Sequence, residues 1–259
     1  MVSYKINVEE ANNLDIYTSK FGGLPYWNKN MAYPTDSKGN KLPLLAQINF
    51  EKEKIEDDRL PKKGMLQFFV AADIMNGMDF GNLDEQKDWK VIYHEEIQKD
   101  ISEEEIKALD IPTSTTLDES KEEYYPFYNE YVLSFEKTNA YISYSRDDFD
   151  EIVLDILKEH FNENIEPGVS LYDYLPREQY YYIVNNFNGY DHKLLGHPDF
   201  TQQDPRESED LNYYDTLLLQ IGSEDGIMWG DSGVANFFIN KKDLENKDFS
   251  KILYTWDCY

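Results

Sequence analysis

The sequence contains few of the residues that disulfides and metal sites require. Its 259 residues include one cysteine, Cys258, and four histidines. A single cysteine cannot form an internal disulfide, which agrees with a reducing compartment. No stretch approaches the roughly 20 apolar residues of a membrane span, and the N-terminus lacks the basic region and apolar run of a signal peptide. We therefore expect a cytoplasmic protein with no membrane partner.

Positive charge is also scarce. The chain has 25 lysines and arginines against 51 acidic residues, a formal net charge of -26. Such a field repels phosphates, so we expect no nucleic-acid partner. The same field would attract a basic protein partner and speed its association at low salt. Acidic stretches such as EKEKIEDD (51–58) are equally consistent with solvated loops that only keep the protein soluble.

The sequence contains an internal repeat. KFGGLPYW (20–27) matches KLLGHPDF (193–200) at its lysine, one glycine and its proline, and each segment ends with an aromatic residue. These two segments begin 173 residues apart, and Gln47 in LLAQI and Gln220 in LLLQI are separated by the same 173 residues. Two further blocks recur in the same order: GMLQFFV (64–70) with GVANFFI (233–239), and DWKVIY (88–93) with DFSKILY (248–254). We therefore predict two copies of one unit, at 16–96 and 191–259.

The repeated blocks have the composition of buried strands. They are short, apolar and rich in aromatic residues, and both faces of MLQFFVA are largely apolar, so each strand should be covered on both sides. Gln47 and Gln220 would then be buried amides, as would Gln67 and Asn236. A buried amide without partners loses roughly 1 to 3 kcal/mol. We expect these four to bond to backbone groups, with ligand contact as the alternative.

The periodicity between the copies is helical. The segment 146–161 is amphipathic, with Ser145 as its N-cap and Asp147 and Asp148 in its first turn. A second helix is predicted from Pro176 through Val184, because proline suits a first helical position.

A third helix is predicted at 101–109, where Ser102 and Glu105 form a capping box and Ile101 and Ile106 occupy the staple positions. Residues 131–135 and 140–145 are predicted to form a hairpin. The sequence thus predicts an α+β fold in one compact domain, 1–259. Two duplicated, mainly antiparallel β-sheet units would pack together around a helical and mixed insertion at 97–190.

A family resemblance extends in order over nearly the whole chain. It is carried by SKFGGLPYW, LPLLAQINF, LPKKGMLQFFV, KVIYHE, HKLLGHPDF with the following QQDPR, LLLQI, MWGDSG and the terminal CY. In these segments the chain resembles the YwqG-like family, bacterial proteins of unknown function. The resemblance implies an α+β fold with internally duplicated β-sheet units. It implies no activity and no catalytic residues, although some relatives occur in toxin and immunity gene neighbourhoods.

Three motifs that suggest chemistry lack the context that this chemistry needs. KFGGLPYW has neither the spacing nor the following helix of a phosphate loop, so its glycines are predicted to form a turn. GDSG (230–233) resembles the serine loop of chymotrypsin-like proteases, but the disulfide-braced barrels of those enzymes cannot form here. SEDG (223–226) does not continue into a calcium loop. We predict no catalytic residue from these motifs.

Polar residues have accumulated in the second copy. His192 and His197 stand where the first copy has Ser19 and Leu24, whereas His94 and His160 are expected to be structural. The candidate ligand-binding residues are His192, His197, Asp199, Trp229 and Asp231. Two histidines without a third histidine or a cysteine are a weak zinc signal, so no metal and no cofactor are predicted.

Two functions remain open. The first is a non-catalytic binding protein, regulatory or immunity-type, whose acidic surface engages a basic protein. The second is an enzyme or small-ligand-binding protein whose site lies at the seam of the two repeats and uses the five candidate residues. The sequence indicates no oligomeric state.

Overall fold

The computed structural model describes residues 1–144, 146, 148–166, 168–187 and 191–259. In these residues ten strands form one antiparallel sheet, in the order β10-β9-β8-β7-β1-β6-β2-β3-β4-β5, and the helices lie outside it. The strands are β1 (Val2–Ala11), β2 (Lys20–Phe21), β3 (Leu44–Asn49), β4 (Met65–Val70), β5 (Trp89–His94), β6 (Glu130–Asn139), β7 (Lys193–Leu194), β8 (Thr216–Gly222), β9 (Val234–Ile239) and β10 (Ile252–Asp257). The helices are α1 (Glu103–Lys107), α2 (Phe149–Phe161), α3 (Leu171–Tyr174), α4 (Arg177–Asn186) and α5 (Lys241–Glu245), with 3-10 turns η1 (Glu119–Lys121) and η2 (Pro205–Glu207). The predicted α+β class is confirmed in outline.

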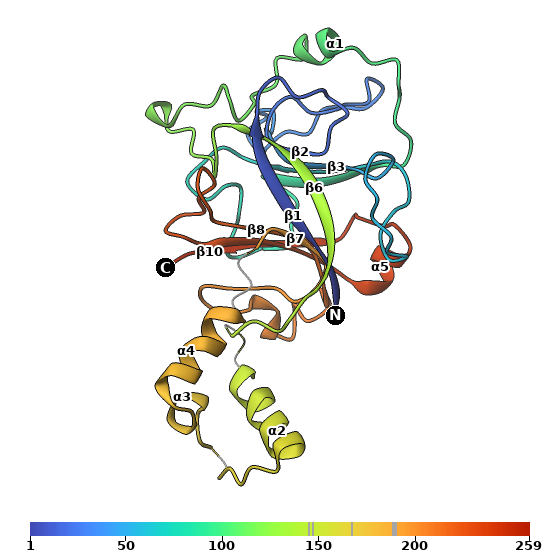
Figure 1. Ribbon diagram of the computed structural model, residues 1–259. Coiled ribbons are helices and arrows are strands. Elements are labelled where there is room, and N and C mark those ends of the chain that lie inside the picture. The colour runs from blue at the N-terminus through green and yellow to red at the C-terminus, as the bar shows by residue number, and fades with distance from the viewer. Residues whose placement is uncertain (145, 147, 167, 188–190) are drawn as a thin grey trace.

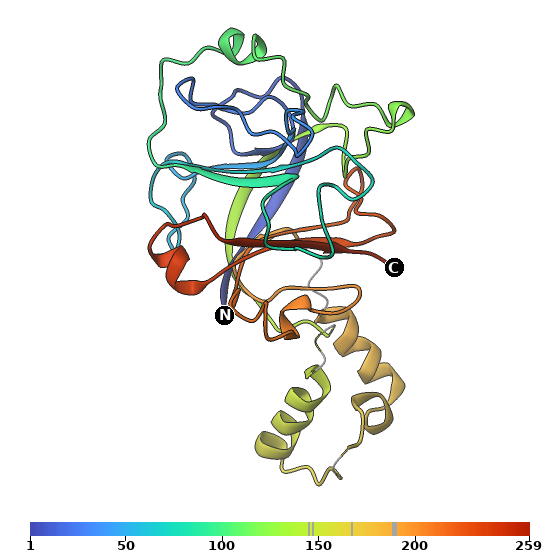
Figure 2. The ribbon, with the colours of Figure 1, turned by 180° about the vertical axis from the view of Figure 1, so that it is seen from behind.

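The sheet folds over on itself. Figures 1 and 2 show β2 to β5 in one layer and β7 to β10 in a second layer, with the long strands β1 and β6 running from one layer to the other. Helices α2, α3 and α4 extend from the second layer, away from the first. These three helices have a small core of their own, around Phe149, Leu154 and Leu171.

The strands follow the same order in the two layers. Outward from β6 the strands are β2, β3, β4 and β5, and outward from β1 they are β7, β8, β9 and β10. Lys20 pairs with Gln47 and Lys193 pairs with Gln220. A register shift interrupts the pairing of β3 with β4 and of β8 with β9 at corresponding places. The four repeated sequence blocks therefore occupy corresponding positions in the two layers.

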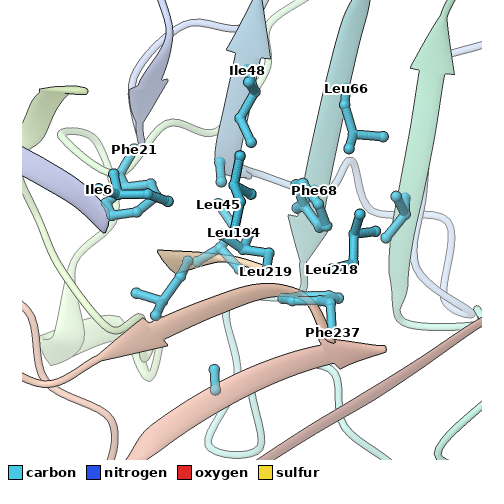
Figure 3. Packing of buried hydrophobic residues seen from close by; sticks show 14 of the residues in the cluster. Ile6, Phe21, Leu45, Ile48, Leu66, Phe68, Leu194, Leu218, Leu219 and Phe237 are labelled. Carbon is cyan, nitrogen blue, oxygen red and sulfur yellow. The ribbon is translucent and has the colours of Figure 1, made fainter. Parts of the chain in front are cut away.

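The main core lies between the layers. Phe68 of β4 packs against Phe237 of β9 with ring centroids 4.9 Å apart, and Trp89 of β5 lies 5.4 Å from Tyr254 of β10. Figure 3 shows side chains of β3 and β4 pointing toward those of β8 and β9. A second cluster, which includes Trp27, covers the other face of β4. All six residues of β4 are buried, as expected for a strand that is covered on both sides.

The buried amides bond mainly to backbone groups. Gln47 Oε1 accepts from the Tyr26 N–H at 2.9 Å, and Gln47 Nε2 donates to the carbonyls of Ile16 and Thr18, both at 2.8 Å. Gln67 Nε2 donates to the Tyr26 carbonyl at 2.7 Å and to Gln47 Oε1 at 2.8 Å. The glutamines therefore tie the KFGGLPYW loop to the sheet, as the backbone-bonding prediction required.

The second layer repeats this arrangement. Gln220 Oε1 accepts from the Asp199 N–H at 2.8 Å, and Gln220 Nε2 donates to the Asp191 carbonyl at 2.8 Å. Asn236 Nδ2 donates to the Asp199 carbonyl at 2.8 Å. The loop that carries His192, His197 and Asp199 is thus held by the same amide positions as the KFGGLPYW loop.

His94 is structural, as expected. Because Gln67 uses its Nε2 as a donor, its Oε1 is an acceptor, and His94 Nε2 donates to this oxygen at 2.9 Å. Burial of the ring lowers the pKa of His94 to about 4. The folded protein therefore binds fewer protons at this site than the unfolded chain, whose histidine titrates near 6.5.

His94 should make stability depend on pH in the acidic range. Its contribution is present above pH 6.5 and is lost as pH falls toward about 4, so lowering pH from about 7.5 to about 5 should remove roughly 2 kcal/mol. His94→Gln can still donate to Gln67 but does not titrate in this range. Urea unfolding of both proteins at the two pH values measures the difference. Equal pH dependence in the two proteins would contradict this account of His94.

Helix α1 carries the predicted capping box. The Glu105 N–H donates to Ser102 Oγ, and Glu105 Oε2 accepts from the Ser102 N–H at 2.8 Å. Helix α2 begins at Phe149, and the N-cap and first-turn roles predicted for Ser145 and Asp147 lie outside the described residues. Helix α4 follows Pro176 as predicted.

One prediction for the middle segment is wrong, and one strand was missed. The hairpin expected at 131–135 and 140–145 is absent: residues 131–135 belong to one strand, β6, which runs on through Asn139, and residues 140–144 form no strand. It pairs along its whole length with β1, a strand that the sequence did not reveal. The EKTN segment continues as a strand because β1 supplies backbone partners for all of it. Both central strands lie outside the units at 16–96 and 191–259, whose boundaries stay a prediction.

Candidate functional site

A pocket lies where the two layers meet. We call it the seam pocket; it has a volume of about 450 Å³. Its residues come from the loop after β4, from η1 and the segment that follows it, from the β8–β9 connection and from β10. They are Ile74, Asn76, Glu119, Tyr124, Tyr125, Pro126, Phe127, Tyr128, Gly226, Met228, Gly230 and Trp256. Aromatic and aliphatic side chains dominate this set, as they do in most small-ligand sites.

Hydrogen bonds between distant segments hold the pocket in shape. The Met228 N–H donates to the Pro126 carbonyl at 2.7 Å, and the Tyr131 hydroxyl donates to the Gly226 carbonyl at 2.9 Å. Gly226 has a φ of +82°, and a Cβ at this position would lie 2.5 Å from the Tyr131 hydroxyl oxygen. A side chain there would be strained at this φ and would displace the Tyr131 hydroxyl that bonds to the turn.

One buried acceptor in the pocket has no partner among the described residues. Asn76 is only 6% exposed, has a φ of +47°, and its carbonyl accepts from the Tyr254 hydroxyl at 3.1 Å. Its side-chain Oδ1 has no hydrogen-bond partner within the described chain. A buried amide oxygen is normally hydrogen-bonded, so this one marks a place where a ligand N–H could bind. The neighbouring Trp256 Nε1 is occupied, since it donates to the Met75 carbonyl at 2.7 Å.

One carboxylate lines the pocket, and three more are next in sequence to lining residues. Glu119 lines the pocket itself and is exposed. Asp73, Asp225 and Asp231 are the chain neighbours of the lining residues Ile74, Gly226 and Gly230. Among the described residues that line the pocket, none carries a positive charge. Aromatic faces together with carboxylates are the groups that bind a cation with an apolar stem.

The structure places Trp229 and Asp231 beside the seam pocket but not in its lining. Trp229 is fully buried, and its ring lies 6.0 Å from that of Trp256. Asp231 is exposed, and its carbonyl accepts from the Tyr259 N–H at 3.1 Å. The pocket is lined by the alternate residues Met228 and Gly230. The two predicted residues therefore lie in a loop that lines the seam pocket, while the lining itself is formed by their neighbours.

His192 lies in a separate cleft beside β1. Its ring is buried, and Nδ1 accepts from the Gly222 N–H at 3.1 Å. In the first layer Ser19 Oγ plays the same part, accepting from the Asn49 N–H at 2.9 Å. Nε2 of His192 points toward Glu224, with 3.5 Å between Nε2 and Oε1.

His197 and Asp199 have different surroundings again. His197 is half-buried, and burial lowers its pKa, with smaller contributions from the N-terminal ammonium and Arg146. Asp199 is fully buried, and its Oδ1 accepts a hydrogen bond from the Ser143 hydroxyl. The five candidates are thus held by different neighbours. Two of them, Trp229 and Asp199, are closed to solvent.

Two lysines are buried in the structure, and the sequence did not predict this. Lys20 and Lys193 occupy corresponding positions in β2 and β7, and burial lowers the pKa of each to about 8. Lys20 Nζ donates to the carbonyls of Leu14 and Asp15, at 3.3 and 3.2 Å. The only sign of these structural lysines in the sequence was that both repeated blocks begin with lysine. Lys20 is therefore a structural residue that holds the preceding loop.

Two other kinds of feature are absent from the described residues. No cluster of three or more His, Cys, Asp or Glu residues in the described part of the chain is arranged to hold a metal ion. Among the described helices, none has both the length and the apolar character that a membrane crossing needs.

Comparisons with known proteins identify a family. Residues 19–258 match the family model described as a domain of unknown function (DUF1963). No curated protein matches the chain.

Proposed function

The chain belongs to the family described as a domain of unknown function (DUF1963), and we propose that it is a non-catalytic binding protein that engages a basic segment of a partner protein. The seam pocket is the observation that carries this proposal. A lysine or arginine side chain of the partner would enter it. The aliphatic stem would pack on the aromatic rings, and the charged end would meet the carboxylates.

Three features of the pocket favour a basic side chain over a neutral one. Tyr124, Tyr128 and Trp256 offer aromatic faces, each of which can contribute about 0.5 to 2 kcal/mol to binding a cation. Glu119 supplies a negative charge at the pocket. Asn76 Oδ1 supplies an acceptor for an ammonium or guanidinium N–H. The net charge of -26 would steer a basic partner toward the protein from a distance.

The alternative function, a small-ligand site built from the five second-copy residues, has less support. Trp229 and Asp199 are fully buried and Asp231 is exposed, so these side chains do not present one accessible surface. A ligand would need them to converge with their polar groups open to the site.

We also propose that the two layers arose by duplication and that the chain groups with the YwqG-like proteins within this family. The corresponding strand order, the matching register at Lys20 and Lys193, and the equivalent roles of Gln47 and Gln220 support the duplication. The segments SKFGGLPYW and HKLLGHPDF are among those that support the grouping.

Binding of basic peptides tests the proposed function. An array of short peptides, each with one central lysine or arginine between apolar residues, should bind at about 50 mM salt and largely dissociate at about 500 mM, because salt screens exposed charges. Glu119→Lys should weaken binding by roughly tenfold or more, and Tyr124→Ala by several-fold.

The matched control is Glu159→Lys. It makes the same change of charge at an exposed position on α2, outside the seam pocket, and should leave affinity within about twofold. Equal losses in Glu119→Lys and Glu159→Lys would show that only net charge matters. Peptides that bind neither variant nor the parent protein at either salt concentration would overturn the proposal.

A further inference from the structure

We propose that strand β1 accepts an extended segment of the basic partner along its unpaired edge, so that the partner adds a strand beside β1. This inference rests on the proposed function and adds a mode of recognition to it. The place of binding is a cleft of about 330 Å³ between β1 and the end of β8. Its lining residues are Lys5, Ile6, Asn7, Val8, Asp191, His192, Ser223 and Glu224.

The edge is unpaired because β7 is much shorter than β1. Strand β1 pairs with β6 from Val2 to Ala11, whereas its pairing with β7 covers only Tyr4 and Lys5. One further bond, from the Ile6 N–H to the His192 carbonyl at 2.8 Å, extends this contact. Beyond Ile6, the described part of the chain offers β1 no second strand.

The strand register identifies which backbone groups of β1 have no partner strand. In an antiparallel sheet, alternate residues of a strand direct their N–H and C=O to opposite neighbours. Ile6 bonds toward β7, so Val8 and Glu10 point the same way, while Asn7 and Glu9 bond to β6. The backbone groups of Val8 and Glu10 therefore face the cleft side, where the described residues provide them with no partner strand. An edge of this kind is a template for another strand.

His192 provides an independent sign of a ligand in the same cleft. Its side chain is 4% exposed, and Nε2 has no hydrogen-bond partner within the described residues. Because Nδ1 accepts from the Gly222 N–H, the neutral ring carries its proton on Nε2. Glu224 Oε1 lies 3.5 Å away, a long contact with His192 that lowers the pKa of this carboxyl and leaves room for a shorter acceptor. A buried donor is thus available to a carbonyl oxygen of an incoming backbone.

The charges around the cleft indicate which kind of partner segment would bind there. Glu9 and Glu10 lie on the unpaired part of β1, and Glu224 and Asp225 lie on the opposite wall or next to it. The nearest basic residue of the lining, Lys5, is paired with Asp191 at 3.7 Å. A segment with alternating lysines would place positive charges among these carboxylates.

The cleft and the seam pocket are separate hollows that share one turn of the chain. Glu224 lines the cleft, and Gly226, two residues later in the same turn, lines the pocket. Glu224 and Ile227 form a bridge that closes this turn. Both proposed contacts of the partner are therefore made next to the same turn.

A backbone-modified peptide separates strand addition from simple charge attraction. The probe is a short peptide of alternating valine and lysine, and its control has the same sequence with every central backbone nitrogen methylated. The two have equal charge, but the control cannot donate to β1. We expect the control to bind roughly tenfold or more weakly. Binding of the unmodified probe should also slow hydrogen exchange at the Val8 and Glu10 amides, with little change at Asn7 and Glu9.

Two protein variants test the same contacts. Val8→Pro removes an N–H that points away from β6 and could donate to a carbonyl of the probe, so it should weaken the unmodified probe several-fold, whereas Val8→Ala should not. His192→Ser preserves a group that can accept from Gly222, as Ser19 does for Asn49, and removes Nε2. It should weaken the unmodified probe several-fold without changing the fold, which circular dichroism would check.

The outcomes distinguish this inference from the proposed function. Salt-sensitive binding of both peptides with equal affinity would overturn strand addition and leave the basic-partner proposal standing. Binding that depends on the backbone but is equally strong for a valine and threonine probe would support strand addition and contradict the basic partner. No binding of either peptide would contradict both.

Discussion

Replacing Gln47 with leucine is expected to lower the free energy of unfolding by about 3 to 4 kcal/mol. The glutamine side chain is fully buried and bonds to the Tyr26 N–H, the Ile16 and Thr18 carbonyls and the Gln67 amide. Leucine fills a similar volume but leaves these groups unpaired inside the protein. Each unpaired buried group lowers stability by roughly 1 to 3 kcal/mol, and the apolar side chain recovers part of that loss. Urea unfolding monitored by tryptophan fluorescence measures the change.

Two further variants calibrate this result. Gln220→Leu should produce a similar loss, because Gln220 bonds to the Asp199 N–H and the Asp191 carbonyl in the second layer. Gln203→Leu makes the same exchange at an exposed position and should change stability by less than about 0.5 kcal/mol. A loss of under about 1 kcal/mol in Gln47→Leu would mean that the amide network does not hold the loop.

Gly64→Ala is expected to destabilise the protein by about 4 kcal/mol. Gly64 has a φ of +82°, in the left-handed region, where an alanine is strained by roughly 1 to 2 kcal/mol. An added Cβ would also lie 2.3 Å from the His94 carbonyl oxygen and 2.9 Å from that of Glu95. Both atoms belong to the backbone at the end of β5, so the clash can be relieved only by moving β4 away from β5.

Gly39→Ala is the matched control for the clash. Gly39 has a φ of +87°, but nothing lies within 4 Å of its added Cβ. Gly39→Ala should therefore lower stability only through the backbone strain of a positive φ, by about 1 to 2 kcal/mol. The difference between the two variants, from thermal or urea unfolding, isolates the contact with β5. Equal losses at both glycines would show that the clash is relieved without disturbing the sheet.

The strands of the repeated blocks were predictable from sequence, and the central strands were not. MLQFFV in β4 is apolar on both faces, so its burial follows from composition alone. β1 contains charged residues at Lys5, Glu9 and Glu10 and has no comparable apolar run. It is a strand because β6, more than 100 residues later, pairs with it from end to end. Pairing between such distant segments has no local signal in the sequence.

The candidate site was predictable only as a region. The contrast between the copies indicated the loop of Trp229 and Asp231, but the residues that face the seam pocket are Met228 and Gly230. The aromatic side of the pocket comes from residues 124–128, which no motif singled out. A pocket built from four distant segments becomes visible only when the layers are packed together.

The sequence by itself determined the strands of the two layers, the buried amides that bind the loops, and the excess of negative charge. These follow from local features: apolar runs, positions shared by repeated blocks, and composition. Only the tertiary structure decided that β1 and β6 join the layers, that β1 keeps an unpaired edge, and that the seam pocket forms beside Gly226. The reason is physical: strand partners, pocket walls and unpaired backbone groups depend on which distant segments meet, and folding sets these contacts through the burial of the whole core.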